Sequence, residues 1–240
     1  EMARWADVIV GDYNYYFDLH AMLHGLAQAN QWQVGVLVDE AHNLVERARR
    51  MHSAALDPQA LAALRASAPP ALKPVLDKLH RAWGVASRAL GGDHTVLPGL
   101  PAAFVEALRR HLVALGDFLT QHPALAPGLQ AWYFDALHWQ RVAEGFGDHA
   151  MVDLTPSRQK GRATIHLRCI VPGPLLAPRW AAAHGATLFS ATLAPMDHAQ
   201  RLLGLPESTA RIDVPSPFDP AQLQVRVVPH LSTRWADRAR

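Results

Sequence analysis

Two carboxylates and an imidazole follow a short apolar run near the start of the chain. The run is Val34 to Val38, and Asp39-Glu40-Ala41-His42 comes directly after it. A carboxylate at the end of a buried strand can hold Mg²⁺ when phosphate oxygens supply the other ligands. A second carboxylate can orient and deprotonate the water that attacks a terminal phosphate. These residue types suit phosphoryl transfer, although Asp-Glu alone is also typical of a solvent-facing helix N-terminus.

The run before Asp39 has the character of a central parallel strand. Successive apolar residues, rather than an alternation, are typical of strands covered on both faces. Residues 7–10 show the same pattern, and residues 16–31 between the two runs predict a helix. Ligands of open α/β sheets bind at the carboxyl ends of the strands, which is where Asp39 and Glu40 would lie.

Residues 53–149 predict a separate helical block. Apolar residues recur at helical spacing along three stripes, which begin at Leu72, Phe104 and Leu129. Breaks that contain proline separate the stripes, as expected for an antiparallel bundle.

The final third returns to β-like runs. They lie at residues 151–154, 163–171, 186–189 and 225–228, with a basic turn at 157–162 and a helix at 195–203 that ends at Gly204. The fold class is therefore α/β, a partial parallel sheet interrupted by a mainly helical insertion.

Composition narrows the function without identifying it. The 240 residues carry 23 Lys plus Arg against 21 Asp plus Glu, a net charge of +2 that does not by itself mark a nucleic-acid binder. The single cysteine, Cys169, cannot build a disulfide or a cysteine-ligated cluster alone. No apolar run is long enough to span a membrane and no signal-peptide pattern begins the chain, so we expect a cytoplasmic protein without a membrane partner.

Four stretches, in order along the chain, resemble the superfamily 2 DNA helicases of the XPD/DinG type, a DEAH-box family with iron–sulfur members. The DEAH box corresponds to motif II and Ser190-Ala191-Thr192-Leu193 to motif III. Residues 6–15 and the Ser-Pro-Phe of 216–218 resemble two further family segments. The helical block lies where this family inserts its arch domain.

The resemblance implies roles for five residues. Asp39 would coordinate the Mg²⁺ of Mg-ATP, and Glu40 would activate the hydrolytic water. His42 would couple to motif III, where Ser190 and Thr192 would link ATP hydrolysis to strand movement.

The resemblance also implies a domain plan and partners. Residues 1–52 would belong to a RecA-like motor domain 1, 53–149 to the arch, 150–212 to the return into motor domain 1, and 213–240 to the lead into motor domain 2. The implied partners are single-stranded DNA and forked or tailed duplex DNA, in repair or related pathways, with a nucleoid association in a bacterium.

Two family features are absent from the printed sequence. A P-loop needs Gly-Lys-Ser/Thr, and none of the three lysines follows a glycine. The cysteines of the family's iron–sulfur cluster are also absent, so a cluster in the parent protein would not be ligated by this chain. We therefore expect a fragment of a longer motor that does not hydrolyse ATP alone.

Two segments are candidates for DNA contacts. Tyr13 and Asn14 lie in an aromatic-rich stretch that could stack on bases, although packing of the tyrosines on the sheet is the preferred interpretation. Arg158, Lys160 and Arg162 lie on the basic turn and suit phosphate contacts, although a solvated turn is the commoner reason for such residues.

Two alternative hypotheses for the function are compatible with the sequence. One is a non-enzymatic helical interaction module on a degenerate α/β platform, which the missing P-loop favours. The other is a metal-dependent hydrolase that uses Asp39, Glu40 and His42, for which the sequence offers no clear set of further ligands.

Overall fold

The computed structural model describes residues 2–122, 127–228, 232 and 234. It divides into two units, Glu1–Glu207 and Ser208–Arg240. The described part of the second unit contains one short 3₁₀ helix, η3 (Pro220–Gln222), and the Asp219 carboxylate accepts a hydrogen bond from the Ala221 amide at its start. Apart from one statement about residues 225–228, all further description concerns the first unit.

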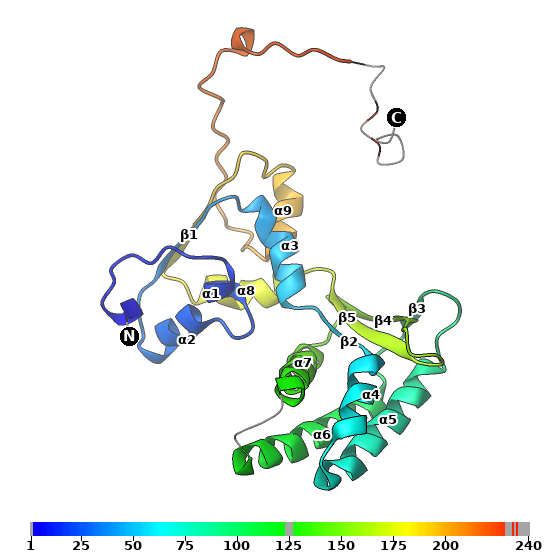
Figure 1. Ribbon diagram of the computed structural model, residues 1–240. Helices are drawn as coiled ribbons and strands as arrows, with labels where there is room; N and C mark the ends of the chain where they lie inside the picture. The colour runs from blue at the N-terminus through cyan, green and yellow to red at the C-terminus, as the bar shows by residue number, and fades with distance from the viewer. Residues whose placement is uncertain (1, 123–126, 229–231, 233, 235–240) are drawn as a thin grey trace. The chain divides into compact units, whose positions relative to one another are not determined.

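The first unit contains two sheets (Figure 1). A parallel pair joins β1 (Gly35–Val38) to β6 (Gly185–Leu188), with Gly35 opposite Gly185. A four-stranded antiparallel sheet has the order β2-β5-β4-β3, and its strands are β2 (Ala54–Leu56), β5 (Ala163–Cys169), β4 (Ala150–Pro156) and β3 (Thr95–Leu97). The parallel pair and the helices confirm the predicted α/β class, whereas the antiparallel sheet was not predicted.

Helices occupy most of the remaining chain. Their bounds are η1 (Met2–Arg4), α1 (Asn14–Phe17), α2 (Met22–Ala29), α3 (His42–Met51), α4 (Pro58–Ser67), η2 (Pro70–Leu72), α5 (Lys73–Ser87), α6 (Ala102–Gln121), α7 (Pro127–Glu144), α8 (Gly173–Ala181) and α9 (Met196–Leu203). The Asp57 carboxylate caps α4 by accepting from the Gln59 amide. Gly204 ends α9 with φ +66°, a left-handed conformation that glycine adopts without strain. No described helix is long and apolar enough to cross a membrane.

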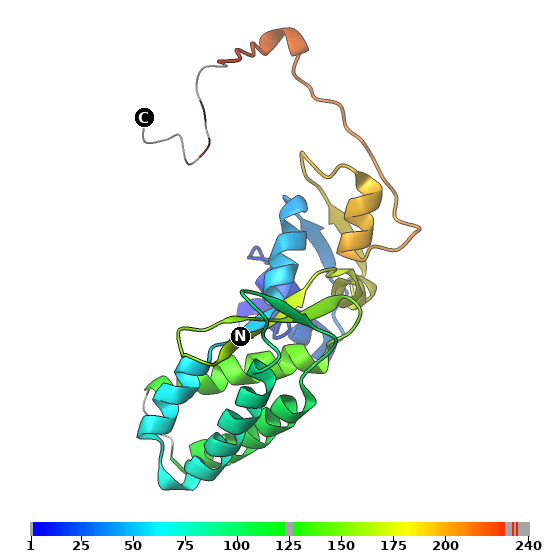
Figure 2. The same cartoon turned by 90° about the vertical axis from the view of Figure 1, so that its right-hand side faces the viewer.

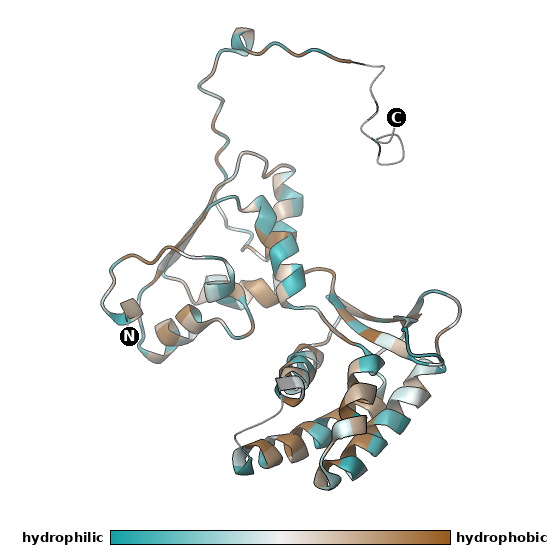
Figure 3. Ribbon diagram, viewed as in Figure 1, coloured by the Kyte–Doolittle hydropathy of each residue, from teal (hydrophilic) through white to brown (hydrophobic). Residues whose placement is uncertain are grey.

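Within the first unit, residues 54–169 form a compact part that we call the inserted unit. It contains α4 to α7 and the antiparallel sheet (Figure 2). Each helix mixes hydrophobic and hydrophilic residues, as amphipathic packing requires (Figure 3). The fully buried large side chains of the core include Trp83, Phe104 and Trp139. The Trp83 indole donates a hydrogen bond of 2.8 Å to the Ala163 carbonyl, which ties α5 to β5.

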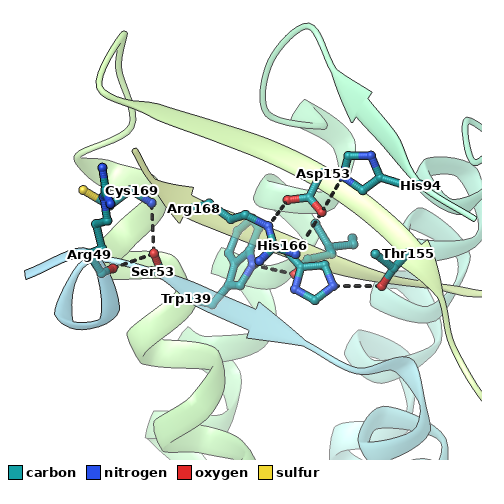
Figure 4. A network of polar contacts seen from close by, with 10 residues as sticks. Arg49, Ser53, His94, Trp139, Asp153, Thr155, His166, Arg168 and Cys169 are labelled. Carbon is teal, nitrogen blue, oxygen red and sulfur yellow. Dashed lines mark hydrogen bonds and ion pairs between the residues drawn. The ribbon is translucent and has the colours of Figure 1, made fainter. Parts of the chain in front are cut away.

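The opposite face of the antiparallel sheet carries a buried charge (Figure 4). Val152 and Leu154 point toward the helices, so Asp153 between them points to the other face. Its carboxylate is fully buried and accepts two hydrogen bonds from Arg168, at 2.6 and 3.1 Å. His94 lies 3.2 Å from the same carboxylate. Charge-assisted bonds of this kind offset the desolvation of Asp153 and join β4 to β5.

Two predicted strands are wrong. Residues 7–10 have no regular structure, and Val10 is 95% exposed. Residues 225–228 are likewise outside any strand. An apolar run becomes a strand only when a neighbouring strand satisfies its backbone groups, and neither segment has such a neighbour among the described residues. The predicted helix at 16–31 is also divided, because an extended turn separates α1 from α2.

The pairing of β4 and β5 bears on the predicted domain plan. Both strands hydrogen-bond within the antiparallel sheet, and their inward residues share the core of α4 to α7. This pairing favours moving the second boundary of the insertion from residue 149 to about residue 170. The plan itself, including the boundaries at 52 and 212, stays a prediction.

Candidate functional site

The carboxyl ends of β1 and β6 place the DEAH box beside motif III. The ladder continues past both strands, since the Phe189 amide donates to the Val38 carbonyl and the Ala41 amide donates to the Phe189 carbonyl. Val38 and Ala41 are buried, whereas Asp39 and Glu40 are exposed. Two segments that are about 150 residues apart therefore meet at one edge of the parallel pair.

Side chains of the two segments bond directly. The Nδ1 atom of His42 lies 2.7 Å from Ser190 Oγ and 3.2 Å from Glu40 Oε2. Ser190 Oγ also accepts a hydrogen bond of 3.3 Å from the Thr192 amide. The structure thus brings together four of the predicted site residues: Glu40 and His42 from one segment, and Ser190 and Thr192 from the other.

The backbone at Asp39 and Glu40 makes a tight turn. Glu40 has φ +47°, a left-handed conformation that is unusual for a residue with a side chain. The Oδ1 atom of Asp39 accepts a hydrogen bond of 2.7 Å from the Glu40 amide, and the Glu40 carbonyl accepts from the Asn43 amide at 2.8 Å. This turn connects β1 to α3 and carries both carboxylates.

Tyr13 packs against this turn. Its phenol oxygen lies 2.5 Å from the Asp39 carbonyl and 3.0 Å from the Glu40 carbonyl. The neighbouring Asp12 pairs with Arg47 of α3, with contacts of 2.5 and 2.6 Å, and its Oδ1 accepts from the Asn14 amide. These bonds lower the pKa of Asp12, the Asn14 amide first and Arg47 second. Sequence reasoning left Tyr13 and Asn14 open between DNA contact and packing on the sheet, and it missed the pairing of Asp12 with Arg47, since no local pattern marks a pair 35 residues apart.

Helix α3 connects the DEAH box to the inserted unit. It begins at His42, and near its end Arg49 Nε donates to the Ile170 carbonyl at 2.9 Å. Ser53 follows the helix and joins two backbones (Figure 4): its hydroxyl donates to the Arg49 carbonyl and accepts from the Cys169 amide. His138 of α7 lies 3.1 Å from the Ser53 carbonyl. The C-terminal end of α3 is therefore fastened to β5 and α7.

The basic residues of the turn at 157–162 differ in their surroundings. Arg158 and Lys160 are exposed on the turn between β4 and β5. Arg162 instead lies across Gly84 of α5, in the space that a Cβ atom would need, and donates to His80 Nε2 at 2.8 Å. Burial and, secondly, the Arg162 charge lower the pKa of His80. Arg162 thus fastens the turn to α5, while Arg158 and Lys160 keep their side chains in solvent.

The residues present suit a shared Mg²⁺ better than a metal held by protein alone. No group of three or more His, Cys, Asp or Glu among the described residues is arranged to hold a metal ion. Mg²⁺ bound with a nucleotide needs only one or two carboxylates, since phosphates and waters complete its shell. The exposed Asp39 meets that need. Cys169 does not suit a metal, because burial raises the pKa of its thiol to about 11.

Comparisons with known proteins agree with this arrangement. Residues 1–61 match the family model DEAD_2. A solved structure titled "XPD_Helicase" has a TM-score of 0.50 and 16% identity, and the match covers 85% of this chain and 35% of that one. A second, titled "XPD_APO", has a TM-score of 0.47 and 16% identity over 80% of this chain and 37% of that one. No curated protein matches the sequence.

The family-model match and the fold of the first solved structure agree with the resemblance to the XPD type of superfamily 2 helicase. The family model covers the segment that contains the DEAH box, and the first solved structure shares the fold. The chain spans about a third of the length of that structure.

Proposed function

We propose that this chain is the central part of an ATP-dependent DNA helicase. In the complete protein it would couple ATP hydrolysis to movement along single-stranded DNA and to the unwinding of forked or tailed duplexes. Such a DNA substrate implies an intracellular site of action, at the nucleoid in a bacterium.

The contact between His42 and Ser190 is the observation that carries the proposal. It joins His42, two residues after Glu40, to Ser190, the first residue of motif III, at 2.7 Å. Glu40 lies 3.2 Å from the same imidazole nitrogen. A change in the position of Glu40 would therefore alter the contact of His42 with the segment after β6. A solvent-facing helix N-terminus, the simplest alternative for Asp-Glu, gives no reason for such a contact.

The exposure of the parallel pair supports a longer parent protein. Leu37 of β1 is 76% exposed, and Phe189 after β6 is also exposed. Two parallel strands rarely make a stable sheet alone, because parallel sheets are normally covered on both faces. Further strands, together with the P-loop that this chain lacks, would come from other parts of the parent. We accordingly expect this chain by itself to be inactive.

Each site residue has a proposed role that its position supports. Asp39 would hold the Mg²⁺ of ATP, and this ion would neutralise charge on the phosphates when it is bound. Glu40, whose side chain is more than half exposed, would accept the proton of the attacking water. His42, Ser190 and Thr192 would transmit the state of that site to the second segment.

The inserted unit would serve as the arch over the translocating strand. Its own buried core and its place between β1 and β6 support that role. Arg158 and Lys160, exposed at the end of its longest hairpin, would contact DNA phosphates. An iron–sulfur cluster, in a parent that holds one, would use cysteines outside this chain. DNA repair, recombination, transcription-coupled and plasmid-related roles are all compatible with such a parent.

The test is the DNA-stimulated ATPase activity of the full-length parent, with wild type beside Glu40→Gln. Glutamine keeps the shape of the side chain and cannot accept the proton, so we expect kcat to fall by about 10²- to 10⁴-fold while ATP binding persists. Glu46→Gln on α3 makes the same chemical change at an exposed residue that pairs with Arg49 and Arg50. That control should keep its activity.

The outcomes separate the hypotheses. Loss of turnover in Glu40→Gln alone would support the motor, and unwinding of a tailed duplex by wild type would extend it to helicase action. A parent without DNA-dependent turnover, or a fully active Glu40→Gln variant, would refute the proposal.

A further inference from the structure

We infer that Tyr13 is a positioning residue for Glu40, whose backbone turn it holds through hydrogen bonds to two successive carbonyls. The inference rests on the proposed role of Glu40 in hydrolysis. It goes beyond that role by assigning to Tyr13 a function in the geometry of the ATP site, in place of the predicted contact with DNA.

The contacts of Tyr13 are directed at the turn itself. One phenol oxygen lies 2.5 Å from the Asp39 carbonyl and 3.0 Å from the Glu40 carbonyl. The single O–H proton is therefore shared between the two acceptors. The ring is partly buried against the core cluster that contains Val38 and Leu44, so it cannot swing freely into solvent. A base-stacking platform would need an exposed ring face, which this packing does not favour.

The turn needs a restraint of this kind. A left-handed conformation at a residue other than glycine is unfavourable, and it persists only where the surroundings over-determine it. Glu40 has φ +47°. Relaxation of that angle would swing the Glu40 carboxylate, and a displacement of about 1 Å at a catalytic group can cost about 10²-fold in rate. The bonds from Tyr13 oppose this relaxation.

A second contact fixes Tyr13 in place. Its neighbour Asp12 pairs with Arg47, which lies on the helix that begins directly after the DEAH turn. The segment around Tyr13 is thus attached on both sides of the turn, to the carbonyls of Asp39 and Glu40 and to α3. A shift of this segment would move both attachments together.

The test is Tyr13→Phe in the full-length parent, with ATPase activity measured against both ATP and single-stranded DNA. The change removes only the hydroxyl. We expect kcat to fall by about 10- to 100-fold, with the KM for ATP and the half-saturating DNA concentration changed less than about twofold. The matched control is Tyr16→Phe, which removes a hydroxyl that donates to the Arg179 carbonyl at 3.3 Å, away from the DEAH turn. It should leave kcat unchanged.

A double variant tests whether Tyr13 acts through Glu40. Because a group that acts through another loses its effect when that group is removed, Tyr13→Phe should cause no further loss in a Glu40→Gln background. Should Tyr13→Phe fail to fold, Asp12→Asn keeps the ring and weakens the second attachment, and it should lower kcat in the same direction by a smaller factor.

Three results would overturn the inference, and each is distinct from failure of the proposed function. An unchanged kcat in Tyr13→Phe beside an inactive Glu40→Gln would exclude positioning and leave the motor intact. A raised half-saturating DNA concentration with unchanged kcat would assign Tyr13 to DNA. Additive losses in the double variant would show that Tyr13 acts independently of Glu40. A parent without DNA-dependent turnover, or a fully active Glu40→Gln variant, would instead refute the proposed function itself.

Discussion

His111 in the core of the inserted unit should make its stability depend on pH. The side chain is fully buried on α6, and its Nε2 accepts a hydrogen bond of 2.9 Å from the Trp132 indole of α7. Protonation would place a second N–H against that indole N–H and would charge a buried ring. Burial accordingly lowers the pKa of His111 to about 4.

The size of the effect follows from linkage. In the unfolded chain the pKa of histidine returns to about 6.5, so the unfolded state takes up protons first as the pH falls. The stabilising contribution is complete above pH 6.5 and is lost between pH 6.5 and about 4. For one such histidine, the free energy of unfolding should fall by about 2 kcal/mol between pH 7 and pH 5. His52, also buried and with its pKa lowered to about 4, should add a similar loss.

The assay is urea denaturation of this chain at pH 7 and pH 5, for wild type and His111→Gln. Glutamine does not titrate, and its amide oxygen can accept from Trp132, so the variant should lose about 2 kcal/mol less on acidification than wild type. The control His20→Gln makes the same change at an exposed histidine and should keep the wild-type dependence. Equal losses in wild type and His111→Gln would refute the reasoning.

Two further predictions concern packing. Ser53→Ala should lower the free energy of unfolding by about 1–3 kcal/mol in urea denaturation, because it leaves the buried amide of Cys169 without its acceptor; an unchanged value would mean that another group satisfies that amide. Gly204→Ala should destabilise the chain strongly, since φ is +66° and a Cβ atom there would overlap the Gly173 backbone. Gly25 lies on an exposed face of α2 with open space around it, so Gly25→Ala should stabilise the chain by about 1 kcal/mol. Thermal denaturation of the two glycine variants measures both signs, and a Gly204→Ala variant as stable as Gly25→Ala would contradict the close approach of α8 and α9.

Short-range signals predicted the helical elements well. Spacing of apolar residues marked α5, α6 and α7, and Gly204 marked the end of α9. These predictions succeed because a helix satisfies its backbone within one segment, so that local residues carry most of the information. The DEAH box was also recognisable locally, because its residues are consecutive.

Strands and long-range pairs were predicted less well. Residues 7–10 have the composition of a strand. A strand also needs a neighbouring strand to pair with, and the composition of the segment does not show whether one is present. The same holds for the antiparallel sheet, whose four strands come from three separate parts of the inserted unit. Arg162 looked like a phosphate contact from its basic surroundings, whereas in the structure it packs on Gly84.

The sequence by itself determined the order of the motifs and the identity of the two carboxylates. It also determined that a helical block lies between the DEAH box and Ser190. Only the tertiary structure decided what these residues touch. It placed His42 against Ser190, turned the Tyr13 hydroxyl onto the backbone of Asp39 and Glu40, and drew β4 and β5 into the inserted unit. The physical reason is that such contacts join segments up to about 150 residues apart. Their geometry depends on how whole elements pack, and no local pattern of residue types records it.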